Sequence, residues 1–311
     1  MLLRKEIPIR YILGKIKFEF AFVSIYAIGI GLVHNYLNIN SINIPIAVPA
    51  IVGTIISLLL AFRSNQAYDR WWEARIIWGA IVNDSRTLIR QVLTFYKTGD
   101  DFEVDDKFKN QFALRQIAWC YSLGSFLRGQ DALTPAKRFL TEEEYRFASK
   151  HNHVPNALLM LHGRSIRKAL DEGRLNRYQQ IEIDQTISRL CDAMGKCERI
   201  KNTIFPTTYS LYIHFVLYLF VLLLPFGLTE YFGFIQVPLV IIMASAFFLI
   251  EKMAIHLQDP FENKPTDTPL TTIARSIEIN LRHMVNKFRD EVEMSGLEIE
   301  LPKMQGTYYV L

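Results

Sequence analysis

The chain has 311 residues, of which 50% are hydrophobic and 21% charged, a balance that fits either a soluble or a membrane protein. Its formal net charge is only +4 and basic residues are mixed with acids, which excludes nucleic acid as the main partner. The sequence contains no GxxxxGK[ST] loop, HExxH, GxSxG or Cys/His cluster with metal-ligand spacing. We therefore predict no enzyme activity, no metal site and no cofactor.

Four windows of the chain are long and almost free of charge, while charge is dense elsewhere. A helix needs about 20 apolar residues to cross the hydrocarbon core of a bilayer, and apolar helices in soluble cores rarely exceed about 14 residues. The sequence therefore predicts an all-α membrane protein with four transmembrane helices, paired within residues 18–62 and 204–250. The windows are residues 18–36, 44–62, 204–228 and 231–250.

Basic residues flank only one end of each window. They precede the first and third windows and follow the second and fourth, whereas the loop at residues 35–43 has no Lys or Arg. Because cytoplasmic segments carry the excess of Lys and Arg, both termini are expected in the cytoplasm. The expected cytoplasmic parts are an N-terminal segment (1–17), a helical region (63–203) and a C-terminal helix with its tail (251–311).

The remaining segments are expected to be helical, because apolar residues recur at helical spacing and no long stretch alternates with period two. Thr141 followed by Glu144 predicts a helix start with a capping box, and Val154-Pro155 predicts another start. Residues 100–106 are expected to form an acidic, solvated break. The expected helices are residues 70–93, 111–127, 154–170, 175–197 and 270–294, with an extended tail at 296–311.

Five prolines lie within the windows, and two interpretations of them stay open. Proline removes a backbone donor and kinks a helix interior, so the spans are either broken helices that line a water-filled path or ordinary membrane helices enriched in proline. The residues are Pro45, Pro49, Pro206, Pro225 and Pro238.

His214 is the titratable side chain that lies deep in a window, and it is either a functional group or a neutral partner between helices. Acidic residues are missing from the window cores, which disfavours an ion-coupled transporter. The three cysteines, Cys120, Cys191 and Cys197, lack CxxC spacing and are expected to be reduced and mostly buried.

Several segments of the chain resemble the bestrophin family of ion channels. The strongest is FRSNQAYDRWWEAR at residues 62–75, followed by Trp78-Gly79. Further similar segments, in the same order, are Cys197-Glu198-Arg199-Ile200, Leu224-Pro225-Phe226 and Asp259-Pro260-Phe261. The short chain is similar to the prokaryotic branch, which implies a multi-pass homopentamer in the plasma membrane of a bacterium, the inner membrane.

The resemblance implies a central pore lined by the second window, with a narrow hydrophobic neck. The positions that match the neck are Thr54, Leu58 and Phe62, and their four-residue spacing keeps them on one helix face. Thr54 departs from the family pattern, in which an apolar residue is more typical. Its hydroxyl is expected to make the outer ring of the neck more polar.

The resemblance also implies a second constriction in the cytoplasmic region, which we align with Tyr178, with Leu175 and Gln179 as alternatives. The motif Asp69-Arg70-Trp71-Trp72-Glu73 is open to two interpretations. It either anchors the helix and packs subunits or contacts ions directly, and the first is favoured.

Animal members of the family hold calcium in an acidic stretch after the fourth span, where this chain has a lysine, Lys264, among the would-be ligands. Calcium gating is therefore not expected. The resemblance implies passive conduction of anions such as chloride, with other copies of the chain, membrane lipid and permeating inorganic ions as partners. A cation channel of the same architecture, a secondary transporter and a membrane-anchored scaffold are the alternatives.

Overall fold

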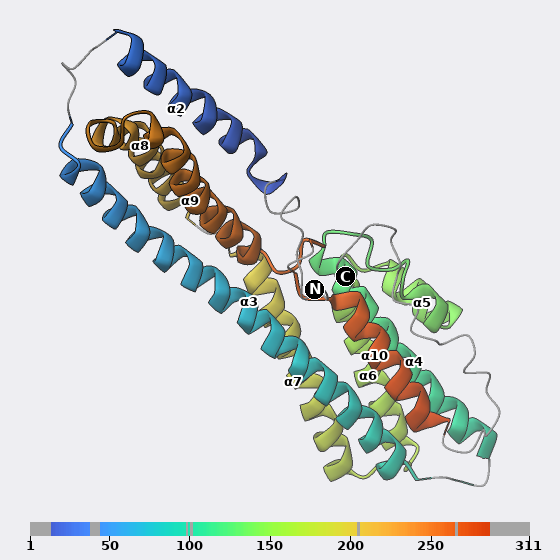
Figure 1. Ribbon diagram of the computed structural model, residues 1–311. Coiled ribbons are helices and arrows are strands. Elements are labelled where there is room, and N and C mark those ends of the chain that lie inside the picture. The colour runs from blue at the N-terminus through green and yellow to red at the C-terminus, as the bar shows by residue number, and fades with distance from the viewer. Residues whose placement is uncertain are drawn as a thin grey trace. The chain divides into compact units, whose positions relative to one another are not determined.

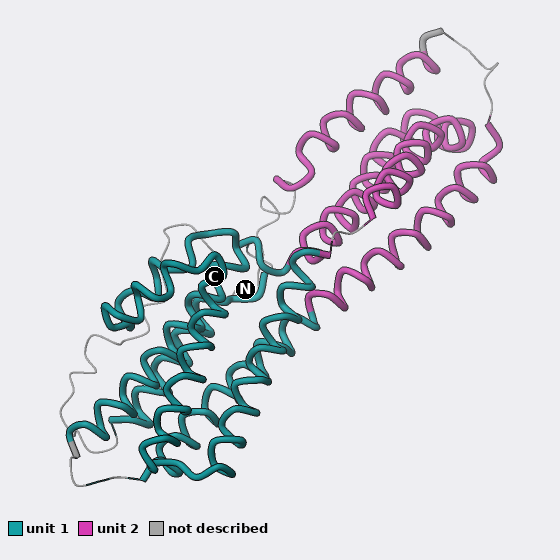
Figure 2. The backbone as a smooth tube through the Cα atoms, turned by 180° about the vertical axis from the view of Figure 1, so that it is seen from behind, with its two compact units in different colours: residues 1–3, 72–202, 260–311 teal, residues 4–71, 203–259 magenta. Residues whose placement is uncertain are grey.

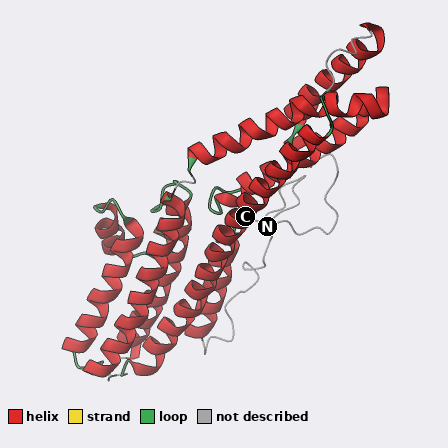
Figure 3. Cartoon of the chain, turned by 90° about the vertical axis from the view of Figure 1, so that its left-hand side faces the viewer, coloured by secondary structure: helices red, strands yellow, loops and turns green. Residues whose placement is uncertain are grey.

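A computed structural model describes residues 14–37, 44–97, 99, 102–203, 206–264 and 267–286. Helices and short turns account for these residues, and no strand occurs among them (Figure 3). The chain divides into two compact units, coloured separately in Figure 2. Unit 1 comprises Met1–Leu3, Trp72–Asn202 and Pro260–Leu311, and unit 2 comprises Arg4–Trp71 and Thr203–Asp259.

Unit 2 contains the apolar helices. They are α2 (Lys17–Leu37), the first part of α3 (Ala47–Phe95), α8 (Thr207–Phe232) and α9 (Gln236–Gln258), shown in Figure 1. The helical stretches long and apolar enough to cross a membrane, among the residues described, are Lys17–Asn35, Ala47–Phe95 and Thr207–Gln258. The last is a hairpin, because α8 and α9 are joined by the short turn Gly233–Ile235 and pack against each other. The protein is therefore a helical membrane protein, and each of the four predicted windows lies largely on one helix.

The prolines mark helix starts more often than helix breaks. Pro45 and Pro206 precede α3 and α8, and Pro49 and Pro238 each occupy the third position of a helix. A proline costs little in a first turn, because the N–H that it lacks has no partner within the helix there. Only Pro225, of these five, lies in a helix beyond its first turn. The interpretation as broken spans is therefore wrong for the other four.

Glycines let the helices of unit 2 approach one another closely. A Cβ atom at Gly53 of α3 would lie 2.9 Å from the ring of Phe220 on α8. One at Gly227 of α8 would lie 2.6 Å from Cγ of Pro49, in the first turn of α3. Small residues at such contacts are typical of membrane helices, where van der Waals packing replaces the hydrophobic effect as the force between helices.

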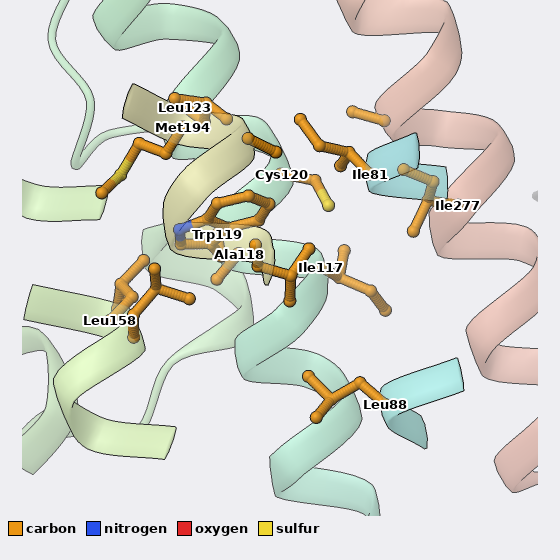
Figure 4. Close-up of a cluster of buried hydrophobic side chains, with 14 of the residues drawn as sticks. Ile81, Leu88, Ile117, Ala118, Trp119, Cys120, Leu123, Leu158, Met194 and Ile277 are labelled. Atoms are coloured by element: carbon orange, nitrogen blue, oxygen red, sulfur yellow. The ribbon is translucent and has the colours of Figure 1, made fainter. Parts of the chain in front are cut away.

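Unit 1 is a helical bundle with its own core. It contains the second part of α3 together with α4 (Phe102–Leu127), α5 (Glu142–Ser149), α6 (Val154–Asp171), α7 (Arg177–Asn202) and α10 (Leu270–Val285). Helix α4 packs against both α6 and α10, and α6 packs against α7. Trp119 of α4 is fully buried near Leu158 and Met194, as Figure 4 shows.

Local helix signals in unit 1 are confirmed. Thr141 accepts a hydrogen bond from the Glu144 backbone, and the Glu144 carboxylate accepts one from the Thr141 backbone at 2.9 Å. The same carboxylate lies 2.5 Å from the buried guanidinium of Arg115 on α4, so the cap also ties α5 to α4. Helix α6 begins at Val154 with Pro155 in its first turn, as predicted.

The predicted acidic break is wrong, because α4 already begins at Phe102. Asp105 is 1% exposed, accepts a hydrogen bond from the Gly99 backbone at 2.5 Å and lies 3.6 Å from Arg174. Its carboxylate therefore closes the loop before α4.

Two further predictions change, and the one on the cysteines holds for two of the three. The predicted helix at 70–93 is no separate element, because α3 continues unbroken through 49 residues. The last predicted helix ends at Val285 instead of 294, and residues 287–311, with the predicted tail, lie outside the described part of the chain. Cys120 and Cys197 are buried as predicted, whereas Cys191 is exposed in the single chain.

We expect Gly227→Ala to destabilise unit 2, because the added methyl would overlap the ring of Pro49. Overpacking of this kind costs about 1–3 kcal/mol. Gly163→Ala on α6 is the matched control, since no atom lies within 4 Å of its added Cβ. Thermal unfolding of the detergent-solubilised protein should show a lower midpoint for the first variant alone. Equal midpoints would contradict the close approach of α8 and α3.

Candidate pore-lining face

One face of α3 in unit 2 carries the three residues predicted to form a neck. Leu58 and Phe62 are 59% and 55% exposed, and Thr54 is exposed on the same face. A four-residue step advances only about 40° around an α-helix, so the three side chains form one stripe. Ile56 and Leu60, on the other side of α3, are buried in the core of unit 2. The stripe is thus uncharged, largely apolar and turned away from the helices that pack against α3.

The hydroxyls on this face are bonded within the helix. Thr54 donates to the Ala50 carbonyl at 2.9 Å, and Ser57 donates to the Gly53 carbonyl at 2.7 Å. Such back-bonding leaves no hydroxyl hydrogen to meet a solute. The Thr54 position is therefore less polar than its residue type suggests.

A group of charged residues lies on the opposite side of α3, behind the stripe, and sequence reasoning missed it. Arg63 and Glu251 are 3% and 1% exposed, and their side chains approach to 3.5 Å. The Glu251 carboxylate also lies 3.0 Å from Nδ1 of His214 on α8. Glu251 follows the fourth window by one residue, but α9 continues to Gln258, so this acid lies inside the helix.

Each residue of this group can be identified in the sequence, but their proximity cannot. Arg63 follows the second window, Glu251 follows the fourth, and His214 lies in the third, so nothing local joins them. A buried ionisable group in a membrane helix is a functional candidate by default, because its burial is costly.

The contacts of Arg70 are structural. Its Nε donates to the Gln258 carbonyl at 2.9 Å and its Nη1 donates to the Thr203 carbonyl at 2.8 Å, while Asp259 lies 3.8 Å away. The carbonyls in the last turn of a helix have no partner within the helix, so Arg70 caps the C-terminus of α9.

The other side chains of the motif lie in different environments. The Trp71 ring lies 6.0 Å from that of Tyr68, and Trp72 is 48% exposed. Glu73 pairs with Arg199 of α7, and Asp69 is exposed. Of these contacts, those of Arg70 and Glu73 involve residues at or near helix ends.

The three residues proposed for the cytoplasmic constriction differ in how exposed their side chains are. Leu175 is 4% exposed and belongs to the core of unit 1. Gln179 is held by Asn176, since each side chain accepts a hydrogen bond from the other residue's backbone, at 3.0 and 2.9 Å. Tyr178 is 83% exposed at the start of α7 and is the one of the three whose side chain projects outward.

Glu262, in the stretch that the resemblance aligns with a calcium site of animal members, lies beside two lysines. Lys264 lies 2.5 Å from the Glu262 carboxylate, and Lys201 lies 3.9 Å from it. The Asp267 carboxylate accepts a hydrogen bond from the Lys264 backbone, and burial raises the pKa of Asp267. Residues 265 and 266 lie outside the described residues.

Two histidines in the loop between α5 and α6, His151 and His153, have partners within the protein. His153 caps α6 by accepting from the Asn156 backbone at 3.2 Å and contacts Glu198 at 2.8 Å. His151 contacts the Phe147 carbonyl at 2.8 Å. No group of three metal-ligating side chains occurs within the ranges that the structure covers.

Comparison with known proteins gives a consistent result. A family model described as Bacterial/Fungal Bestrophin protein matches residues 9–283. A voltage-dependent anion channel-forming protein of Ralstonia nicotianae is 30% identical over 238 residues, 76% of each chain. One of Escherichia coli K12 is 30% identical over 79% of this chain and 77% of its own. A crystal structure of a bacterial bestrophin homologue from Klebsiella pneumoniae superposes with a TM-score of 0.80 at 26% identity, covering 87% of this chain and 98% of that one.

We expect Arg70→Gln to lower stability by about 1.5–3 kcal/mol, because the helix-end carbonyls lose hydrogen bonds to a charged donor. Arg75→Gln is the control, since Arg75 lies five residues further along α3 and is exposed. The midpoint of thermal unfolding in detergent tests this difference. If both variants unfold at the same temperature, the capping role of Arg70 is wrong.

Proposed function

The chain belongs to the bestrophin family, and from that premise we propose that it is a homopentameric ion channel that conducts anions passively through a central pore. The observation that carries this proposal is the uncharged stripe of Thr54, Leu58 and Phe62 on the exposed face of α3. The family and the names of the relatives indicate a channel and not an enzyme.

In a ring of α3 helices from several copies of the chain, the stripe of each copy would face the stripes of the others. In a single chain the apolar side chains of Leu58 and Phe62 are more than half exposed, so they meet lipid, water or other copies of the chain. Five copies turned with this face inward would enclose a narrow neck at these positions. An apolar constriction of this kind can gate a channel by dewetting, because ions do not pass once water has left it.

The sign of the conducted ion must come from outside the neck. Thr54, Leu58 and Phe62 carry no charge, so helix ends, vestibule charge or dehydration would select the ion. The relatives are named as anion-channel-forming, which supports anion conduction with chloride as the physiological candidate. A cation channel of the same architecture is the second candidate, and a secondary transporter is the third.

Two further features belong to this proposal. Tyr178, exposed at the start of α7, would form a second ring on the cytoplasmic side. The distribution of Lys and Arg supports cytoplasmic positions for the segments 1–17, 63–203 and 251–311, in the inner membrane of a bacterium. Lipid would cover the outer faces of the spans.

Recordings from the purified protein in a planar bilayer with unequal KCl concentrations test conduction and ion sign together. We expect unitary currents whose reversal potential lies near that of chloride and which persist when EGTA removes calcium. A reversal potential near that of potassium would support the cation channel. Flux that saturates, without unitary currents, would support the transporter, and no flux at all would support the scaffold.

Shortening the side chains of the stripe should widen the neck. We expect Leu58→Ala to raise unitary conductance and Phe62→Ala to raise open probability, because each removes apolar bulk from the proposed constriction. Leu211→Ala is the matched control, since Leu211 is 62% exposed on α8 and lies outside the stripe. Currents unchanged in both stripe variants, or changed equally by the control, would remove the neck from these positions.

A further inference from the structure

We propose that Glu251 is a positioning residue for the neck, and that the neighbouring His214 makes this positioning sensitive to protons, an inference that rests on the proposed channel function. The two residues lie on α9 and α8, and they act on the neck through Arg63 of α3. None of the three belongs to the stripe itself.

Arg63 connects the neck to the helices behind it. It directly follows Phe62 in α3, yet Phe62 is 55% exposed and Arg63 is 3% exposed. Its Nη1 lies 3.5 Å from Oε1 of Glu251, and its Nη2 donates to the Ser210 hydroxyl of α8 at 3.2 Å. The rotation of α3 at Phe62 is therefore set by where α8 and α9 hold Arg63.

One carboxylate oxygen faces two basic side chains, Arg63 and His214. The Oε1 atom of Glu251 that approaches Arg63 also lies 3.0 Å from Nδ1 of His214. Both carboxylate oxygens are buried, and neither accepts a hydrogen bond from the described residues. A buried carboxylate is costly without a counter-charge, so the state of Glu251 depends on these ion pairs.

The other charged groups around Glu251 have partners of their own. Lys252, the next residue of α9, lies 2.7 Å from Glu19 of α2. His256 of α9 lies 3.3 Å from Lys15. Tyr209 and Tyr218 of α8 are further titratable groups near Arg63, Glu251 and Glu19. Glu251 is thus in contact with Arg63 and His214. Histidine, unlike arginine, is a side chain type that changes charge near neutral pH.

Protonation of His214 would change the force on Arg63. With a neutral imidazole, Glu251 has one full cation at Oε1, and its attraction holds Arg63 in place. With an imidazolium, two positive charges surround one oxygen and repel each other, so the net pull on Arg63 falls. Helix α3 is then less firmly held at Phe62, and the neck opens more readily.

The test is the current of the full-length channel between about pH 8 and pH 5.5, a range that brackets the ordinary titration of histidine. We expect acidification to raise the current several-fold, and His214→Gln and Glu251→Gln to abolish this dependence. His34→Gln, which removes a histidine from α2, is the control and should keep the wild-type profile. A flat wild-type profile, or an unchanged profile in His214→Gln, overturns the proposal.

Thermal unfolding provides a measurement that needs no conduction. The unfolding midpoint of the purified protein is recorded against pH for the wild type, His214→Gln and His34→Gln. We expect the profile of His214→Gln alone to differ from that of the wild type. If no variant conducts at any pH, the channel function fails; identical unfolding profiles would show that His214 is not coupled to the fold and would overturn the proton sensitivity.

Discussion

A bilayer offers no water to the backbone, so every N–H and C=O in its core must be bonded within the protein. Helices meet this demand locally, and the helices of unit 2 are the result. The constraint also explains where the irregular residues lie. Pro49 and Pro238 occupy first turns, where a helix N–H has no partner within the helix, and Arg70 donates to the Gln258 carbonyl at the end of α9.

Helix α3 has two faces with different tasks. The face with Ile56 and Leu60 is buried, and the close approaches at Gly53 and Gly227 bring it against α8. The other face carries the uncharged stripe. Because a helix is rigid, the contacts on the buried face determine how the exposed face is presented. Arg63 adds an ion pair to the contacts on the buried face, because its buried guanidinium lies beside the Glu251 carboxylate.

Membership of the bestrophin family leaves room for features particular to this chain. Thr54 places a hydroxyl where an apolar side chain is more typical, but the bond to Ala50 turns that hydroxyl back into the helix. Lys264 and Lys201 lie beside Glu262, in the stretch that the resemblance aligns with a calcium site.

Sequence by itself determined what depends on local rules. Hydrophobic length predicted the spans, the capping residues Thr141 and Glu144 predicted the start of α5, and the four-residue spacing of Thr54, Leu58 and Phe62 predicted a common face. Tertiary structure decided which side chains meet or are buried: Asp105 pairs with Arg174, Leu175 is buried in the core of unit 1, and Arg63, Glu251 and His214 converge from three helices. These contacts join residues far apart in the chain, and no periodicity or spacing encodes them, because their energy depends on burial that arises only when the helices pack together.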